Sequence, residues 1–348
     1  GAKNKKVIMP SYSCVVVANA VIESGNIPIF LDNKKNSFQP NPEEYFKAID
    51  EDTIMVIPTH LFGITQEYRK EYKKIKRKYP HVFVLQDCAH SFFCKDSDGY
   101  FIGKWGDGAL FGMNISKLVN SVKGGMLTIN DTEIEKRIRK NFSTQLNKKN
   151  NFNDILKSRL YVLCSSLAFI PFIYNLIFIL IKHTNLLNSF TQYYDKNNTK
   201  LPKDYCELPL NYNAKIGILS LLKYDKRIEN RKKIAKIYVK HLKCNKDIVI
   251  PRFKHGYTWS HFPILINKNK KERIISELLK INMEPGFIID YSISEIPIYY
   301  EKFSIKASNS IDTYKRIINL PVCLLENTFN KNIHQKILKI CKIINHNT

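Results

Sequence analysis

Short apolar runs alternate with longer polar stretches through residues 1–130, and this pattern limits the fold more than any other feature of the chain. Each run is apolar at nearly every position, which is typical of strands buried on both faces of a parallel sheet. The polar stretch 66–79 has the length of a helix and ends at Pro80. We therefore expect an α/β fold with a mostly parallel sheet covered by helices. The predicted strands are Val7–Met9, Ile27–Leu31, Ile54–Ile57, Val82–Gln86, Ala109–Gly112 and Met126–Ile129.

Polar residues directly follow four of these predicted strands: Asp32, His60, Asp87 and Asn114. The carboxyl ends of parallel strands share one edge of a sheet, so we expect all four residues to lie on one rim. Ligands of such sheets bind beyond this edge. The rim is therefore where we expect a functional site.

Asp87, Lys117 and the pair Gly124-Gly125 follow one another in an order that is typical of a pyridoxal phosphate (PLP) site. The lysine would bond to the cofactor aldehyde, and the aspartate would keep the pyridine nitrogen protonated so that the ring accepts electrons. Partial desolvation would lower the pKa of the lysine amine enough for attack. Taken singly, Asp87 is explained as well by a helix N-cap and Lys117 by a solvated loop. The combination favours a site.

Ordered segments along the chain resemble the DegT family of PLP-dependent sugar-nucleotide aminotransferases. Gln86-Asp-Cys-Ala-His-Ser91 is similar to the family's E-D-A/C-A-Q/H, and the segment from Phe111 to Lys117 is similar to F-S-F-x-x-x-K. The resemblance runs from about Lys6 to Asn345 apart from one insertion, and it implies the aspartate-aminotransferase (type I) fold. The other matching segments are 10–21, 25–32, 57–63, 210–213, 259–263 and 319–321.

The resemblance implies roles for five residues. Lys117 would form the Schiff base with PLP and move a proton between Cα of the amino donor and C4′ of the cofactor. Asp87 would pair with the pyridine nitrogen, and His90 would lie near the 3-hydroxyl. Asn213 would reach the cofactor phosphate of the neighbouring subunit, so activity would require a homodimer. Cys14 stands where the family usually has an aromatic residue stacked on the ring, and a thiol stacks less broadly.

The chain departs from the family pattern at the cofactor phosphate. Gly112 replaces a serine that binds the phosphate, and Lys123 replaces an acidic residue before the Gly-Gly pair. The family's Ser-Gly-Thr loop, which offers backbone N–H groups to the phosphate, belongs before Lys6. We therefore expect a large domain that lacks its N-terminal strand and helix, and a chain that binds PLP poorly as given. The predicted function belongs to the complete protein.

The C-terminal half predicts a second, smaller unit. Residues 214–243 have the pattern of a long helix or helix pair, interpreted as a solvated amphipathic connector. Short strands at 259–266 and 317–322, with helices at 270–281 and 331–345, predict a small α+β domain that closes over the site. The predicted division is 1–150 for the PLP-binding large domain, 151–205 for an apolar helical insertion, 206–243 for the connector and 244–348 for the small domain.

The insertion contains an uncharged segment, Leu160 to Ile181, whose length would suffice to span a bilayer. A crossing would place Lys117 and Asn213 on opposite sides of the membrane, and Pro171 divides the segment into two halves that are too short. Our hypothesis is a helical hairpin that dips into the cytoplasmic leaflet. The alternative is a hairpin buried against the dimer partner or the core.

The net charge of +24 admits nucleic acid, an anionic membrane or acidic ligands as partners. The basic residues are spread along exposed helical faces, which favours a compositional bias instead. The chain has no interleaved aromatic and basic platform and no nucleic-acid-binding motif, so we expect no nucleic-acid partner. No zinc-type spacing occurs, and the eight cysteines lack a disulfide framework, as expected for a cytoplasmic protein.

These observations predict a PLP-dependent aminotransferase of cell-surface polysaccharide or amino-sugar biosynthesis. It would move an amino group from an amino acid, expected to be glutamate, to a keto-sugar nucleotide. Some relatives act as dehydratases with histidine in place of the lysine, so Lys117 favours transamination. The alternative is a non-catalytic, membrane-associated scaffold derived from the same fold.

Overall fold

The computed structural model describes residues 2–145, 155–156, 159–160, 162–163, 199–201, 205, 207–283, 285–286, 288–303, 306–323 and 331–348. Most of the predicted insertion, including Pro171 and nearly all of the uncharged segment, lies outside these residues. Among the described residues, no helix combines the length and apolarity needed to cross a membrane. The boundaries predicted at residues 150, 205 and 243 stay predictions.

A six-stranded sheet forms the N-terminal half, as the apolar runs predicted. Its strand order is β2-β1-β3-β4-β5-β6, and every neighbouring pair is parallel except β5 with β6. The fold is therefore α/β with a mostly parallel sheet. The strands are β1 (Lys6–Pro10), β2 (Ile27–Leu31), β3 (Thr53–Val56), β4 (Phe83–Asp87), β5 (Gly108–Gly112) and β6 (Gly125–Ile129).

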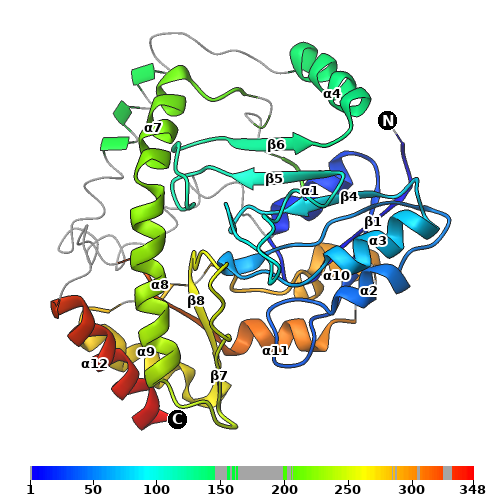
Figure 1. Ribbon diagram of the computed structural model, residues 1–348. Coiled ribbons are helices and arrows are strands. Elements are labelled where there is room, and N and C mark those ends of the chain that lie inside the picture. Colours follow the sequence, from blue (N-terminus) through cyan, green and yellow to red (C-terminus); the bar gives the residue numbers. More distant parts are fainter. Residues whose placement is uncertain are drawn as a thin grey trace.

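Both faces of this sheet are covered, which explains why its strands are apolar at consecutive positions. Val7 and Met9 of β1 belong to one core cluster and Ile8 to another. The first cluster includes α1 (Val15–Glu23), and the second includes α2 (Pro42–Lys47) and α3 (Arg69–Lys78). Helix α1 ends just before Gly25, which adopts a φ of +76°. Figure 1 shows α2 and α3 together on one side of the sheet.

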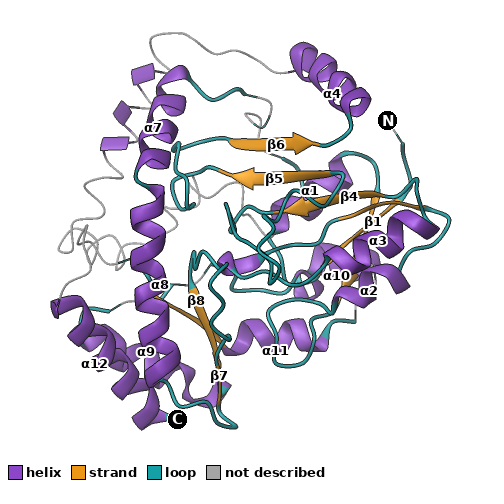
Figure 2. Cartoon of the chain, in the orientation of Figure 1, coloured by secondary structure: helices purple, strands orange, loops and turns teal. Residues whose placement is uncertain are grey.

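Two helices connect the sheet to the C-terminal part of the chain. After α4 (Thr132–Gln145), helices α7 (Asn211–Leu222) and α8 (Tyr224–His241) run almost end to end along one side of the molecule (Figures 1 and 2). The prediction of a solvated connector agrees with α7, where Leu219 and Leu222 are exposed. It is wrong for α8, because Ile234 and Tyr238 are buried in a second core.

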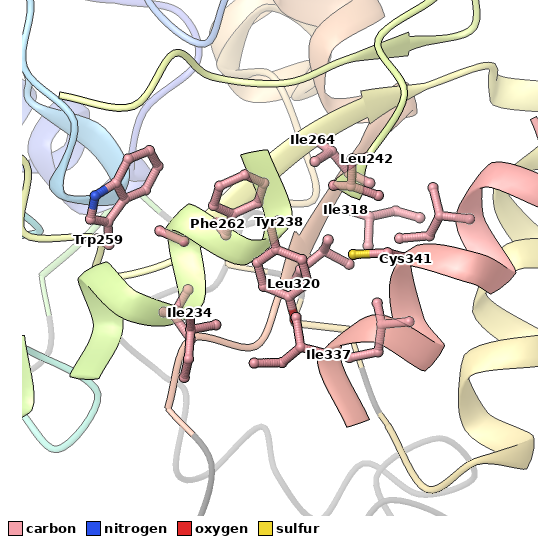
Figure 3. Packing of buried hydrophobic residues seen from close by; sticks show 14 of the residues in the cluster. Ile234, Tyr238, Leu242, Trp259, Phe262, Ile264, Ile318, Leu320, Ile337 and Cys341 are labelled. Atoms are coloured by element: carbon pink, nitrogen blue, oxygen red, sulfur yellow. The ribbon is translucent and has the colours of Figure 1, made fainter. Parts of the chain in front are cut away.

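A three-stranded antiparallel sheet, β7-β8-β9, organises this second core. Helices α8, α9 and α12 pack together beside it, and Trp259, Phe262 and Tyr238 lie in a row of ring contacts (Figure 3). We call the buried cluster shown in Figure 3 the C-terminal core. Besides α8, its elements are β7 (Ile248–Val249), β8 (Phe262–Ile266), β9 (Ile317–Leu320), α9 (Lys271–Lys280) and α12 (Lys331–Asn347). The 3₁₀ turn η4 (Lys268–Lys270) joins β8 to α9.

One C-terminal segment returns to the large sheet. It contains η5 (Ile293–Glu295), α10 (Pro297–Phe303) and α11 (Ser308–Arg316), and its buried residues Tyr291 and Tyr299 join the cluster around α1. The backbone N–H of Ile293 donates to Ser11 O, just after β1. The C-terminal region therefore covers one end of the sheet as well as forming its own core.

Candidate active site

Lys117 lies in a loop that follows β5 and is anchored on both sides. The adjacent Leu118 and Val119 are buried against Phe92 and Tyr224. The lysine N–H donates to Asn114 O at 3.0 Å, which closes a turn. These contacts hold the partly buried lysine side chain near the rim of the sheet.

Gly124 closes the lysine loop, because the backbone N–H of Met113 donates to its carbonyl at 3.0 Å. It adopts a φ of +112°, and a Cβ there would lie 2.7 Å from Pro209 Cγ. Glycine is therefore required at this position, which explains the Gly-Gly signal in the sequence.

Asp87 is the last residue of β4 and is almost completely buried. Its Oδ1 accepts a hydrogen bond from the N–H of Ala89 at 3.0 Å, so the carboxylate caps the turn that follows the strand. The helix N-cap alternative is wrong, because β4 is followed by turns and then β5 rather than by a helix. Burial raises the pKa of this carboxyl, opposed by the Ala89 N–H and by the charge of Lys117. A cationic partner at the carboxylate would stabilise its charged form.

Lys117 and Asp87 interact electrostatically, each shifting the pKa of the other. Burial lowers the pKa of the Lys117 amine, while Cys14 and Asp87 oppose this shift. A lowered pKa leaves more of the amine neutral near pH 7, as a nucleophilic lysine requires. The predicted pair is therefore brought together at one edge of the sheet.

His90 lies in the loop after β4 and is buried on one side. Its Nδ1 is buried and has no hydrogen-bond partner among the described residues. Burial and the charge of Lys117 hold the pKa of His90 well below its ordinary value, so the ring is neutral. A buried ring nitrogen without a partner is expected at a ligand site rather than in a finished core.

Cys14 immediately precedes α1 and interacts with both Lys117 and Asp87. Burial raises the pKa of its thiol, so the thiol is neutral. The hydroxyl of Tyr291, from the returning C-terminal segment, contacts this thiol and accepts a hydrogen bond from the N–H of Val15 at 2.9 Å. An aromatic residue therefore does reach this side of the site, from position 291 rather than from position 14.

Asn213 lies in the first turn of α7, and its side chain is buried. Its Oδ1 accepts from the N–H of Leu210 at 3.0 Å, while its Nδ2 has no acceptor among the described residues. Helix α7 packs on the lysine loop, because the N–H of Asn120 donates to Ser220 Oγ at 2.9 Å. The amide nitrogen is thus held beside the loop that carries Lys117.

The other rim residues have structural partners. Asp32 accepts hydrogen bonds from the N–H groups of Asn309 and Ser310 at the start of α11. His60 is fully buried, with Nε2 3.2 Å from Gln86 Oε1 and Nδ1 2.9 Å from Thr65 Oγ1. Asn114 Oδ1 accepts hydrogen bonds from the N–H and the hydroxyl of Ser116. Of the four residues predicted on the rim, Asp87 therefore stays the candidate for the site.

The position of the Lys117 side chain explains why glycine replaces the family's serine at position 112. A Cβ at this position would lie 3.0 Å from Lys117 Cε and 3.3 Å from Ala89 Cβ. The stem of the lysine occupies the space that a serine side chain would need. No hydroxyl is available here for a cofactor phosphate.

Two residues of the site were not predicted from the sequence. Both belong to the C-terminal region: His261 interacts electrostatically with Lys117, and Tyr291 contacts the thiol of Cys14. The segment Trp259–Pro263 was noted only as a landmark of the smaller domain. The presence of a histidine in that segment was the one sequence feature that could have indicated a functional role. No sequence feature indicated a role for Tyr291.

The site fits a carbonyl-bearing aromatic cofactor. It offers a partly buried amine of lowered pKa, a buried carboxylate within electrostatic reach, and the buried Nδ1 of His90, which has no hydrogen-bond partner among the described residues. These are the groups needed to hold PLP by its aldehyde, its ring nitrogen and its polar substituents. Among the described residues, no cluster of potential ligands could hold a metal ion.

The profile of the DegT/DnrJ/EryC1/StrS aminotransferase family matches residues 1–166 and 210–336. A curated relative, GDP-perosamine synthase of Escherichia coli O157:H7, is 23% identical over 360 residues, covering 99% of this chain and 79% of that protein.

Two solved structures have the same fold. Helicobacter pylori PseC, an aminotransferase involved in the biosynthesis of pseudoaminic acid, gives a TM-score of 0.71 at 18% identity, covering 98% of this chain and 80% of that chain. Escherichia coli GDP-4-keto-6-deoxy-D-mannose-3-dehydratase, with bound hydrated PLP, gives a TM-score of 0.71 at 15% identity, covering 99% of this chain and 80% of that chain. An aminotransferase and a dehydratase thus match equally well, so the fold does not distinguish the two reactions.

Proposed function

We propose that this chain, which belongs to the DegT/DnrJ/EryC1/StrS aminotransferase family, aminates a keto-sugar nucleotide. The protein is a PLP-dependent aminotransferase. Its amino donor would be an amino acid, which we expect to be glutamate. The product would be an amino sugar linked to a nucleotide, as the curated relative's name, GDP-perosamine synthase, suggests. We expect this amino sugar to enter a surface polysaccharide or a related glycan.

The pairing of Lys117 with Asp87 carries this proposal. The two side chains interact across the end of the large sheet, and burial lowers the pKa of the amine. The proposal takes transamination over dehydration because position 117 is a lysine, which can both bond to an aldehyde and move a proton.

PLP, when bound, supplies an aldehyde that carries the amino group and a ring that takes up the electron pair released at Cα of the donor. The Nζ of Lys117 would hold the aldehyde and later move a proton between Cα of the donor and C4′ of the cofactor. The carboxylate of Asp87 would hold a proton on the ring nitrogen, since its attraction to that positive charge offsets the free-energy cost of burying the carboxylate. Neutral His90 would hydrogen-bond the ring hydroxyl through a nitrogen.

Asn213 and α7 support a homodimer. The outer face of α7 exposes the apolar side chains Ile218, Leu219 and Leu222, and Met126 and Leu127 of β6 are also exposed. An apolar face of this kind is favoured at subunit contacts. We propose that two copies pair through it, and that Asn213 Nδ2 then meets the phosphate in the partner's site.

The proposal is tested by cofactor binding and single half-reactions. Purified protein, incubated with PLP, should show a visible absorbance band that changes when glutamate is added. Addition of a keto-sugar nucleotide should then restore the band, with the amino sugar found by mass spectrometry. Lys117→Ala should abolish the covalent attachment, detected after borohydride reduction. Wild-type protein that shows no lysine-linked PLP would overturn the proposal and favour the scaffold.

A cytoplasmic location and membrane contact through 160–181 remain hypotheses. Carbonate extraction and flotation of the expressed protein address them: recovery of all the protein in the soluble fraction would contradict membrane contact. The separation of a large domain from a small one is likewise a proposal, and limited proteolysis near residue 150 and residue 205 would test it.

A further inference from the structure

Three rings from three separate segments face one another beside Lys117. His90 follows β4, Phe62 belongs to the turn η1 (Leu61–Gly63), and His261 precedes β8. The ring centroids are 6.0 Å apart for His90 and His261, 6.2 Å for Phe62 and His90, and 6.3 Å for Phe62 and His261. Aromatic pairs at this separation attract one another weakly and fix the planes of the rings.

The segment that carries His261 is held firmly in place. Nη1 of Arg231, on α8, donates to the carbonyl oxygens of Trp259 at 3.1 Å and Ser260 at 2.7 Å. The N–H of Thr258 donates to Gly63 O at 2.9 Å, and that of His261 to Phe62 O at 3.4 Å. These bonds join the His261 segment to both α8 and the η1 turn of the large sheet.

Gly63 shows how close this junction is. It adopts a φ of +71°, and a Cβ there would lie 2.5 Å from the backbone N of Trp259. A side chain at position 63 is therefore excluded. The approach of the two segments fixes the position of the His261 ring relative to Phe62.

His261 is also neutral, like His90. Burial lowers its pKa to about 3, helped by the charges of Arg231 and Lys117. Its Nδ1 lies 3.2 Å from Ser260 Oγ, a contact that ties the ring to its own segment rather than to His90. The contact between the two imidazoles is thus one of packed neutral rings.

We propose that His261 is a positioning residue of the cofactor site: its ring, pressed against His90 and Phe62, holds the plane of the His90 imidazole so that the ring presents its unpaired nitrogen to the ligand. The C-terminal region thereby takes part in cofactor binding without touching the cofactor. This inference rests on the proposed function, since it assigns the ligand of His90 to PLP.

Two substitutions distinguish the contribution of the His261 ring from that of its nitrogen atoms. His261→Ala removes both, whereas His261→Phe keeps a ring of similar size. PLP affinity is measured by absorbance titration of cofactor-free protein. We expect His261→Ala to weaken PLP binding about tenfold or more, the size of effect seen when a residue that orients a metal ligand is removed. The PLP affinity of His261→Phe should stay within about threefold of wild type. Phe253→Ala, a control that removes a ring stacked on Trp259, should leave the affinity unchanged.

A second measurement is independent of the cofactor. The rate at which diethyl pyrocarbonate modifies His90, followed by mass spectrometry, reports whether its ring is held. We expect this rate to rise about tenfold in His261→Ala and to be unchanged in His261→Phe. Equal rates in all three proteins, or a His261→Phe variant as impaired as His261→Ala, would overturn the inference. Failure of wild type to bind PLP would instead refute the proposed function, and the modification rates would still decide the role of His261.

Discussion

The rim of the large sheet and the C-terminal core are both buried, but they bury side chains of opposite kinds. The rim holds Lys117, Asp87 and His90, whose pKa values are shifted, and one ring nitrogen of His90 has no hydrogen-bond partner in the described part of the chain. The C-terminal core holds apolar side chains such as Ile264 and Leu278 at 1% exposure or less. Burial stabilises the second group and costs free energy for the first.

This difference separates residues kept for binding from those kept for stability. The two histidines that follow β3 and β4 show it on a small scale. Both nitrogens of His60 have partners, as a structural residue requires, whereas Nδ1 of His90 has none among the described residues. We therefore expect substitutions at the rim to remove function and substitutions in the core to remove stability.

The largest effect should come from Lys117→Met. We expect kcat for amino transfer to fall at least about ten-thousand-fold, because the variant loses both the covalent attachment and the proton carrier. The free energy of unfolding at pH 7 should not fall, since the buried amine is replaced by an apolar side chain of similar length. Steady-state kinetics and urea unfolding measure the two quantities.

Lys104→Met is the matched control, because Lys104 is an exposed lysine that precedes β5. It should retain wild-type kcat. A Lys117→Met protein that is clearly less stable than wild type would show that the lysine also holds the loop, and the contrast between rim and core would weaken.

The next effect tests the core with two adjacent leucines of α9. Leu278 is 1% exposed and Leu279 is 38% exposed. We expect Leu278→Ala to lower the free energy of unfolding by about 2–5 kcal/mol, through lost burial and a residual cavity, and Leu279→Ala by less than about 1 kcal/mol. Neither should change kcat of the folded enzyme. A fall in kcat for Leu278→Ala would show that the core and the rim are coupled.

The pH dependence of stability gives a third test. Burial lowers the pKa of His60 to about 4 from an ordinary 6.5. The unfolded chain therefore binds more protons between these values, and the free energy of unfolding falls as the pH drops from 6.5 towards 4. The loss through this one residue should be about 2–3 kcal/mol. Above pH 6.5 its contribution is constant.

His60→Gln should flatten this decline, although it costs stability at pH 7 by breaking two buried contacts. His81 is exposed, so His81→Gln should leave the decline unchanged. Urea unfolding at pH 7.0 and pH 4.5 measures the difference. An equally steep decline in His60→Gln would assign the acid sensitivity to other groups, His90 and His261 among them.

The smallest effect is expected at the junction between the two regions. Lys254 Nζ lies 3.1 Å from Glu67 Oε1, with side chains 40% and 44% exposed. Such exposed pairs contribute little, so Lys254→Met should change the free energy of unfolding by less than about 1 kcal/mol, and less in 1 M salt. A larger loss would mean that charge, rather than packing at Gly63, joins the two regions.

Much of the large sheet was predictable because its signals are local. The six apolar runs predicted all six strands. Asp87 and Lys117 were predicted because the first ends a strand, the second lies in the loop after the next strand, and the Gly pair follows that loop. Burial on both faces accounts for the uninterrupted apolar runs, with Val7 and Met9 in one cluster and Ile8 in the other.

The remaining parts depend on contacts between distant segments, which no local pattern records. The apolar positions of α8 looked like one face of an exposed helix, because its partner α12 lies about a hundred residues further on. Asp32 and His60 share the strand-end position of Asp87, and only their partners show them to be structural. Tyr291 and His261 reach the site through tertiary packing, so their role could not be predicted from their neighbours in the sequence.

The returning C-terminal segment has a consequence for how the protein is made. Ser11, Tyr12 and Val15 bond to Ser292, Ile289 and Tyr291, some 276–281 residues later. At ordinary translation rates, α1 therefore waits roughly 15–60 s on the ribosome before its covering segment is synthesised. During that interval its apolar face is open to solvent, so we expect the nascent chain to need chaperone protection.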